Sequence, residues 1–195
     1  MIKGISMTII DMIRHAESDT TVHDDFSRPF TQKGYRQSQQ IAYNLRQIPY
    51  STIFSSPFKR AVDTVVPIAR DHGLPIQTDD RLVERKMPSW VSDFSEYVAH
   101  QWRDLTFFKS PGESIFQVQK RYLSFLYSLP ATSFGAIGSH GTAISSVIES
   151  AMPGKGGDFF KTLSYAAVTR LEVSDHQIVR IASWSENFKA FISLE

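Results

Sequence analysis

An arginine and a histidine stand side by side directly after an apolar segment near the start of the chain. Residues 7–13 read Met-Thr-Ile-Ile-Asp-Met-Ile and are followed by Arg14 and His15. A second short apolar segment, residues 134–139, ends in the same way on His140. In open α/β sheets, ligands bind at the edge where the strands have their carboxyl ends. Two histidines at strand ends, with an arginine beside one of them, indicate a site for phosphoryl transfer.

Two further side chains can reach the same edge. Arg60 falls in the first turn of a helix that we predict after the short strand 51–55, and Glu84 lies in a loop beyond a strand that begins at Pro75. The strands of a parallel sheet all end at one edge, so these side chains can converge with the two histidines.

Each of these side chains fits a step in the hydrolysis of a phosphate monoester, a reaction that is extremely slow in water. A neutral His15 imidazole can attack phosphorus and form a covalent phosphohistidine. Arg14 and Arg60 can bind phosphate oxygens bidentately, and their charges disfavour protonation of the nucleophile. His140 can donate a hydrogen bond to the transferring group, while Glu84 can protonate the departing oxygen and then deprotonate water. The guanidinium groups and His140 supply the positive charge, so no metal or other cofactor is expected.

The elements that must position these residues alternate between strands and helices. We predict helices that begin after Thr31, at Pro57, after Ser114 and after His140, with Pro67 kinking or shortening the second of them. A closing antiparallel hairpin is expected from strands 168–173 and 177–184, and residues 154–157 form a candidate mobile loop. This alternation predicts an α/β fold: a three-layer α/β/α sandwich whose central sheet is mostly parallel with an antiparallel edge.

Residues 85–112 form a predicted cap, read as a mainly helical insertion. Six aromatic residues occupy the stretch 90–108. Most of them are expected to pack the cap onto the sheet, because aromatic residues are usually core residues. The alternative is that they form an apolar wall for the leaving group of a substrate.

Composition limits the classes of protein that need to be considered. The 195 residues suggest a single domain spanning 1–195, and the net charge of +1 provides no field for binding nucleic acid or an anionic membrane. The chain has no cysteine, which excludes disulfides and thiolate chemistry. No apolar run of about 18 residues predicts a membrane span, and the first six residues lack the features of a secretory signal, so a cytoplasmic location is expected. No metal-binding histidine spacing, Walker-type loop or serine-hydrolase motif is present.

In several motifs, and in their order, the chain resembles the histidine phosphatase superfamily, also called the phosphoglycerate mutase-like family. The resemblance extends from about Met7 to Trp184. It is carried by six segments: Arg14-His15-Ala16-Glu17, residues 26–31 with Gly34 and Gln37, residues 55–61, Leu82-Val83-Glu84, Pro111-Gly112-Glu113-Ser114 and Ser139-His140-Gly141-Thr142.

The resemblance implies a role for each site residue. His15 would be the nucleophile and Glu84 the general acid, with Arg14, Arg60 and His140 forming the phosphate pocket. Thr21 stands where the family often has asparagine at the lip of this pocket, and it is a candidate phosphate contact. Residues 85–90 replace the turn that commonly follows the acid in the family.

The reading that fits best is a metal-independent phosphatase that acts on small phosphate monoesters through a phosphohistidine. A phosphoglycerate mutase is the first alternative, although mutases of the family tend to be longer. A protein-phosphohistidine phosphatase is another, but that branch generally lacks the Glu84 loop and the cap. A noncatalytic phosphoester-binding module on the same fold is the alternative from outside enzymes. The sequence determines neither the physiological substrate nor the oligomeric state.

Overall fold

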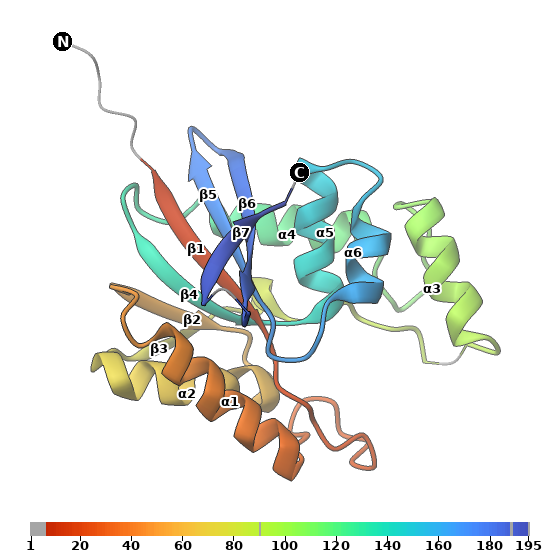
Figure 1. Cartoon of the computed structure of the whole chain (residues 1–195). Coiled ribbons are helices and arrows are strands. Elements are labelled where there is room, and N and C mark those ends of the chain that lie inside the picture. The colour runs from red at the N-terminus through yellow and green to blue at the C-terminus, as the bar shows by residue number, and fades with distance from the viewer. Residues whose placement is uncertain (1–6, 90, 188, 195) are drawn as a thin grey trace.

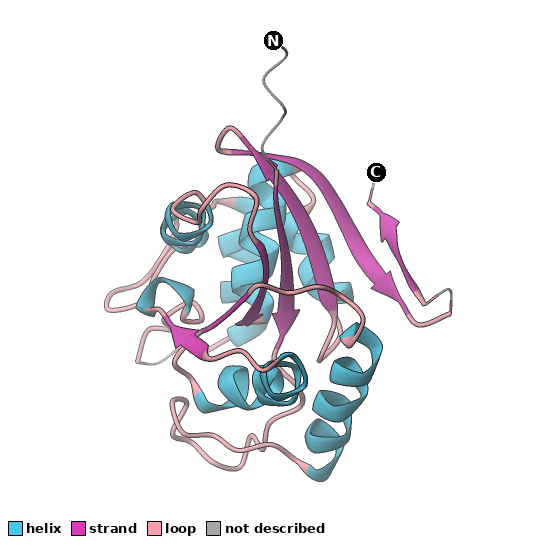
Figure 2. Ribbon diagram, turned by 90° about the vertical axis from the view of Figure 1, so that its left-hand side faces the viewer, coloured by secondary structure: helices cyan, strands magenta, loops and turns pink. Residues whose placement is uncertain are grey.

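A seven-stranded sheet forms the centre of the protein in a computed structural model that describes residues 7–89, 91–187 and 189–194. The strand order is β3-β2-β4-β1-β5-β6-β7, with parallel pairing from β3 to β1 and antiparallel pairing from β1 to β7. Figure 2 shows β7 at the outer end of the antiparallel part. The strands are β1 (Thr8–Arg14), β2 (Thr52–Ser55), β3 (Ile76–Thr78), β4 (Phe134–Ser139), β5 (Val168–Ser174), β6 (Gln177–Ser185) and β7 (Ala190–Ser193).

Helices cover both faces of this sheet, which makes three layers (Figure 1). Helices α1 and α2 pack on one face, and α4 and α5 pack on the other. The remaining helices, α3 and α6, lie together beyond α5. The bounds are α1 (Gln32–Leu45), α2 (Lys59–His72), α3 (Phe94–Arg103), α4 (Ile115–Leu126), α5 (Gly141–Ala151) and α6 (Gly156–Thr162), with a 3₁₀ turn η1 at Asp80–Leu82.

Alternation along β1 explains why both faces are covered. Ile10 and Met12 point into the core under α4 and α5, whereas Ile13 points into the core under α1 and α2. Neighbouring residues of β4 divide in the same way, with Ile137 on the first face and Ala136 on the second. Successive strand residues face opposite sides, so an apolar strand requires a helical layer on each side. The predicted three-layer fold with a mostly parallel sheet and an antiparallel edge is confirmed.

Several local predictions were wrong in detail. Helix α2 begins at Lys59 rather than Pro57, and it runs through Pro67 to His72 instead of being shortened. The predicted loop 154–157 contains the start of α6 at Gly156. Strand β7 was not predicted. Its four residues pair with β6, where Phe191 packs against Trp184 with ring centroids 5.3 Å apart.

The segment predicted as a cap, residues 85–112, contains one helix, α3, and otherwise irregular backbone in its described part. Figure 1 shows α3 beside α6, at the side of the molecule away from α1 and α2. Trp90, one of the aromatic residues of this segment, lies outside the described residues, as does the N-terminal segment 1–6. Among the described helices, none has the length and apolarity needed to cross a membrane.

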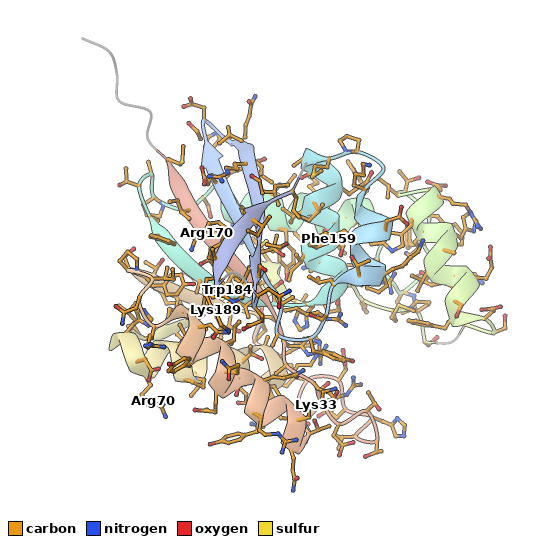
Figure 3. The ribbon with its side chains drawn as sticks, viewed as in Figure 1. Lys33, Arg70, Phe159, Arg170, Trp184 and Lys189 are labelled. Carbon is orange, nitrogen blue, oxygen red and sulfur yellow. The ribbon has the colours of Figure 1, made fainter. Side chains whose placement is uncertain are left out.

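A buried ion pair joins the parallel and antiparallel parts of the sheet. Asp11 on β1 is fully buried and accepts two hydrogen bonds from Arg170 on β5, at 2.7 and 2.8 Å. The guanidinium group of Arg170, labelled in Figure 3, also stacks on the ring of Phe191 at 3.7 Å. Tyr50 donates a third hydrogen bond to the Asp11 carboxylate. The pair therefore connects β1, β5 and β7.

Replacing Arg170 by methionine should destabilise the fold strongly. The substitution keeps the length of the side chain but leaves the Asp11 carboxylate buried without its cation, which typically costs about 3 to 5 kcal/mol. Urea denaturation measures the loss in the free energy of unfolding. Arg180→Met is the matched control, because Arg180 pairs with Glu172 on the exposed surface and should cost less than about 1 kcal/mol. Equal losses for the two variants would contradict this view of the pair.

Candidate active site

The carboxyl ends of β1, β2 and β4 lie together at one edge of the sheet. In the strand register, Arg14 is paired with Ser139, and Ser55 is paired with Gly138. The backbone N–H of His15 continues this ladder by donating to the carbonyl of Ser139 at 2.8 Å. A pocket of about 780 Å³ opens at this edge. Its lining includes Arg14, His15, Arg60 and Glu84, together with Asp25, Arg28, Phe58, Met87, Phe94 and Phe160.

His15 is held with one ring nitrogen free. Its Nδ1 lies 2.8 Å from the carbonyl oxygen of Ala16. A carbonyl oxygen only accepts, so Nδ1 carries the proton and Nε2 keeps a lone pair. Burial, together with the nearby charges of Arg60 and Arg14, lowers the pKa of His15 to about 3 against the opposing bond to Ala16. The imidazole is therefore neutral at neutral pH, as a nucleophile requires.

Arg14 is held by the loop that precedes β5. Its guanidinium group donates to the carbonyl of Leu163 and lies 4.4 Å from the ring centroid of Tyr165. Gly141 makes room on the other side, because a Cβ there would come within 3.3 Å of the guanidinium. The Nε atom is buried without a hydrogen-bond partner among the described residues. Arg14 thus keeps a donor available at the pocket wall.

Arg60 reaches the pocket from the first turn of α2. Gly138 allows this helix to approach β4, since a Cβ there would lie 2.6 Å from the carbonyl of Ala61. The Arg60 guanidinium pairs with the Asp25 carboxylate at 3.0 Å, and its Nε is buried without a partner among the described residues. Burial lowers the pKa of Arg60, but an arginine remains charged at any physiological pH. Its charge is therefore available to an anion in the pocket.

His140 lies directly behind His15. The two ring centroids are 5.4 Å apart, and the ring of Phe58 lies 5.3 Å from His140 on another side. His140 is fully buried and does not contribute to the pocket surface. Both of its ring nitrogens lack a partner in the described part of the chain, and burial lowers its pKa well below the usual value. Buried polar atoms are nearly always hydrogen-bonded, so a bound ligand is expected to supply a partner for this ring.

Glu84 faces the start of α5 from a loop after η1. Its carboxylate accepts one hydrogen bond from the backbone N–H of Thr142, at 3.2 Å, and another from the N–H of Arg85, at 2.7 Å. The side chain lines the pocket together with His15. The general-acid candidate and the nucleophile candidate are therefore on the walls of one cavity.

A partly buried arginine holds the Glu84 loop. Arg121 on α4 donates to the backbone carbonyls of Arg81, Val83 and Glu84, at 2.7, 2.7 and 3.1 Å. It also makes two hydrogen bonds of 3.0 Å with the carboxylate of Glu113, which in turn accepts from the N–H of Lys86. Three hydrogen bonds from Arg121 thus hold the backbone up to the acid, and Glu113, bound by the other two, holds the backbone after it.

The structure brings five of the six predicted site residues together and leaves the sixth apart. Thr21 lies in an exposed turn, where its hydroxyl donates to Asp19 at 2.7 Å, and it is not among the residues that line the pocket. Its contact with phosphate stays a prediction. The sequence reasoning missed Asp25 and Arg28, which line the pocket from the loop that also contains Thr21. The only signal was the position of Arg28 in a motif of the family, and no pattern indicated Asp25.

The two buried histidines should make the protein less stable in mild acid. In the unfolded chain a histidine binds a proton near pH 6.5. In the fold, burial lowers the pKa of His15 to about 3 and that of His140 well below its usual value. As pH falls below 6.5 the unfolded chain therefore binds protons that the folded chain does not, and unfolding becomes more favourable.

A change from pH 7.5 to 5.5 should lower the free energy of unfolding by about 2 to 3 kcal/mol, roughly half from each histidine. Urea denaturation at the two pH values measures this difference. His140→Gln removes one of the two groups, so its pH dependence should be about half that of the native protein. A native protein that is equally stable at both pH values would refute the prediction.

Comparison with known proteins identifies the family of this chain. The sequence model of the histidine phosphatase superfamily (branch 1) matches residues 10–187, and the chain belongs to this superfamily. The match includes every predicted site residue, from Arg14 to His140.

Individual relatives include both mutases and phosphatases. A 2,3-bisphosphoglycerate-dependent phosphoglycerate mutase from Thermoplasma acidophilum is 40% identical over 83 residues, a region that covers 40% of this chain and only 42% of that mutase. A solved structure of a mycobacterial glucosyl-3-phosphoglycerate phosphatase has a TM-score of 0.73 at 20% identity, covering 91% of this chain and 97% of that one. A phosphoserine phosphatase mutant from Entamoeba histolytica, in complex with phosphoserine, has a TM-score of 0.69 at 20% identity, with coverage of 86% and 95%. At these identities the two structures share the fold with this chain.

Proposed function

We propose that this protein is a metal-independent phosphatase that hydrolyses phosphate monoesters through a phosphohistidine on His15. The observation that supports this most directly is the state of His15. Its proton is held on Nδ1 by the Ala16 carbonyl, and its ring lines a pocket that it shares with Arg14, Arg60 and Glu84. A neutral imidazole beside two guanidinium groups is the arrangement that attack on an anionic phosphoryl group requires.

The reaction proceeds in two steps. In the first, Nε2 of His15 forms a bond to phosphorus while the bond between phosphorus and the leaving oxygen breaks, and Glu84 gives its proton to that oxygen. In the second, Glu84 takes a proton from water, the resulting hydroxide bonds to phosphorus, and the bond between phosphorus and nitrogen breaks. Glu84 ends protonated and His15 ends neutral, so both groups are restored.

Positive charge for both steps comes from the protein itself. Arg14 and Arg60 each have a buried Nε without a partner in the described chain, so they can add hydrogen bonds to phosphate oxygens. Charge-assisted bonds of this kind are about twice as strong as neutral ones. In this proposal His140 adds a hydrogen bond to the transferring group. We therefore expect turnover to be unaffected by a chelator.

A phosphoglycerate mutase is the second candidate, and it is favoured by the 40% identity with the Thermoplasma acidophilum enzyme. Hydrolysis fits the pocket better. One part of its wall combines Met87, Phe94 and Phe160 with Phe58, which favours an apolar leaving group. Arg28, Arg85 and Lys86 line another part and could bind the carboxylate of a phosphoglycerate. A mutase must also hold phosphoglycerate so that either of its two oxygen positions can exchange a phosphoryl group with the enzyme.

Two assays on the purified protein, both in the presence of EDTA, test the proposal. The first measures phosphate release from a panel of aryl, alkyl, sugar and amino-acid phosphates. The second is a coupled assay that follows interconversion of 3-phosphoglycerate and 2-phosphoglycerate with catalytic 2,3-bisphosphoglycerate. The proposal expects phosphate release in EDTA and little interconversion. Interconversion that far exceeds phosphate release would identify a mutase, and binding of phosphate without either activity would identify a noncatalytic module.

Replacing Arg121 should slow protonation of the leaving oxygen by Glu84 more than it slows attack by His15 on phosphorus. Arg121→Met deletes three hydrogen bonds to the backbone of the Glu84 loop and two to Glu113. We expect kcat for an alkyl phosphate, whose leaving oxygen needs the proton, to fall by about 10- to 100-fold, and the rate of the dinitrophenol burst from 2,4-dinitrophenyl phosphate to fall only a few-fold. Arg70→Met, an exposed arginine of α2 whose ion pair is with neighbouring Asp71, is the control. Equal losses in alkyl phosphate turnover and in the burst rate would show that Arg121 only supports the fold.

A further inference from the structure

A groove of about 510 Å³ runs between α3 and α6, next to the active-site pocket. The two helices lie side by side in Figure 1. Phe94, at the start of α3, and Phe160, on α6, line both the groove and the active-site pocket. The two hollows are therefore adjacent, and these aromatic side chains lie between them. A volume of this size accommodates a small organic group.

Apolar side chains from both helices line the groove on facing sides, with charged residues also present in the lining. Val98, Ala99 and Trp102 line it from α3, facing Phe160 of α6, whose ring centroid is 6.0 Å from that of Trp102. Phe94 remains 56% exposed at the junction, although it is a large apolar side chain. Exposed apolar patches commonly mark ligand-binding grooves.

The charged residues around the groove already have partners. Lys161 pairs with Asp158 at 2.9 Å, and Arg103 pairs with Glu96. Both oxygens of the Glu149 carboxylate are occupied, because they accept from the N–H groups of Gly154 and Gly156 at 2.7 Å each. Among its described residues the groove therefore offers apolar surface, and each charged group there already has an ion-pair or hydrogen-bond partner.

We propose that this groove binds the leaving group of the substrate, and that the preferred substrates are phosphate monoesters of an elongated, uncharged, apolar alcohol. This inference rests on the proposed phosphatase function and adds its substrate class. The phosphate lies by His15, Arg14 and Arg60, and the organic group passes Phe94 and Phe160 into the groove. A small acidic alcohol does not reach the groove and gains nothing from it.

The chain-length dependence of turnover tests the proposal. We would measure kcat/KM of the native protein for ethyl, butyl and octyl phosphate, each below its micelle-forming concentration, and for 3-phosphoglycerate. Each methylene removed from water contributes roughly a fourfold factor, so a rise of at least about 30-fold from ethyl to octyl phosphate is expected. No rise with chain length would overturn the proposal. So would a preference for 3-phosphoglycerate, which would place the leaving group by Arg85 and Lys86 of the active-site pocket instead.

A substitution inside the groove supplies the second test. Ala99 lines the groove but not the active-site pocket, and Ala99→Glu places a bulky carboxylate there. The ratio of kcat/KM for octyl phosphate to that for ethyl phosphate should fall by about 10-fold, and by less in the uncharged Ala99→Gln. Ala131→Glu is the matched control, because Ala131 is exposed in the loop before β4, at the opposite edge of the sheet. A ratio that is the same in Ala99→Glu and Ala131→Glu would contradict the proposal.

The proposed function and the assignment of the groove would be refuted by different results. If the native protein releases phosphate from none of the esters, the proposed function is wrong. If it hydrolyses them all with no dependence on chain length, only the assignment of the groove is wrong.

Discussion

Replacing His15 by alanine should lower kcat for phosphate release by about 10⁴-fold or more. The loss is this large because the imidazole forms the bond to phosphorus, and no other group of the described pocket has a free nitrogen lone pair at its surface. The measurement is phosphate release from an aryl phosphate in EDTA, at substrate concentrations well above KM. Arg14, Arg60 and His140 remain in the variant, so it should still bind inorganic phosphate.

His23→Ala is the control for this experiment. His23 is exposed in the loop after β1 and is not among the residues that line the pocket. The His15 variant is expected to fold, since alanine removes a buried imidazole that lowers the free energy of unfolding in acid. Turnover that survives in His15→Ala at the level of His23→Ala would exclude His15 as the nucleophile.

Glu84→Gln should have an effect that depends on the leaving group. Glutamine keeps the shape of the side chain, and its oxygen can still accept from the N–H of Thr142. It has no proton to give at the acid step, so kcat for an alkyl phosphate should fall by about 10²- to 10⁴-fold. The first step with 2,4-dinitrophenyl phosphate needs no proton, so the phosphoenzyme should still form quickly with this ester, and a rapid burst of dinitrophenol should precede slow turnover.

Glu113→Gln is the matched control for the acid. Glu113 is bound to Arg121 rather than to the pocket, and its substitution retains the shape of the same network. It should therefore affect both esters alike and far less than Glu84→Gln does. If Glu84→Gln slows the burst of dinitrophenol as much as it slows alkyl phosphate turnover, Glu84 does not act as the general acid.

Much of the fold could be predicted because it follows from local patterns. Four of the seven residues of β1 are apolar, and because they point to both faces they indicate a strand buried on both sides. The sheet accordingly has helices on both faces. Four of the site residues follow strands directly or within a turn. Once a parallel sheet is predicted, their convergence at one edge follows from geometry, and the register of Arg14 with Ser139 confirms it.

The remainder depends on contacts between distant residues, which no local pattern records. Strand β7 has only four residues, and it is stabilised by Trp184 and by the guanidinium of Arg170. Asp25 meets Arg60 across 35 residues, and Arg121 reaches a loop about 40 residues before it. The sequence does not distinguish a solvated charged residue in a polar loop from one that pairs with an arginine of the pocket. The helix start at Lys59 also departs from expectation, because Pro57 lies in the turn before the helix rather than within it.

Trapping the covalent intermediate tests the central claim most directly. The protein would be mixed with excess aryl phosphate, quenched within milliseconds in denaturant at alkaline pH, where phosphohistidine is stable, and analysed by peptide mass spectrometry. The account predicts one phosphoryl group, on His15, which is lost in acid and absent from His15→Ala. Phosphate carried by any other residue, or rapid turnover during which no phosphoenzyme forms, would contradict it.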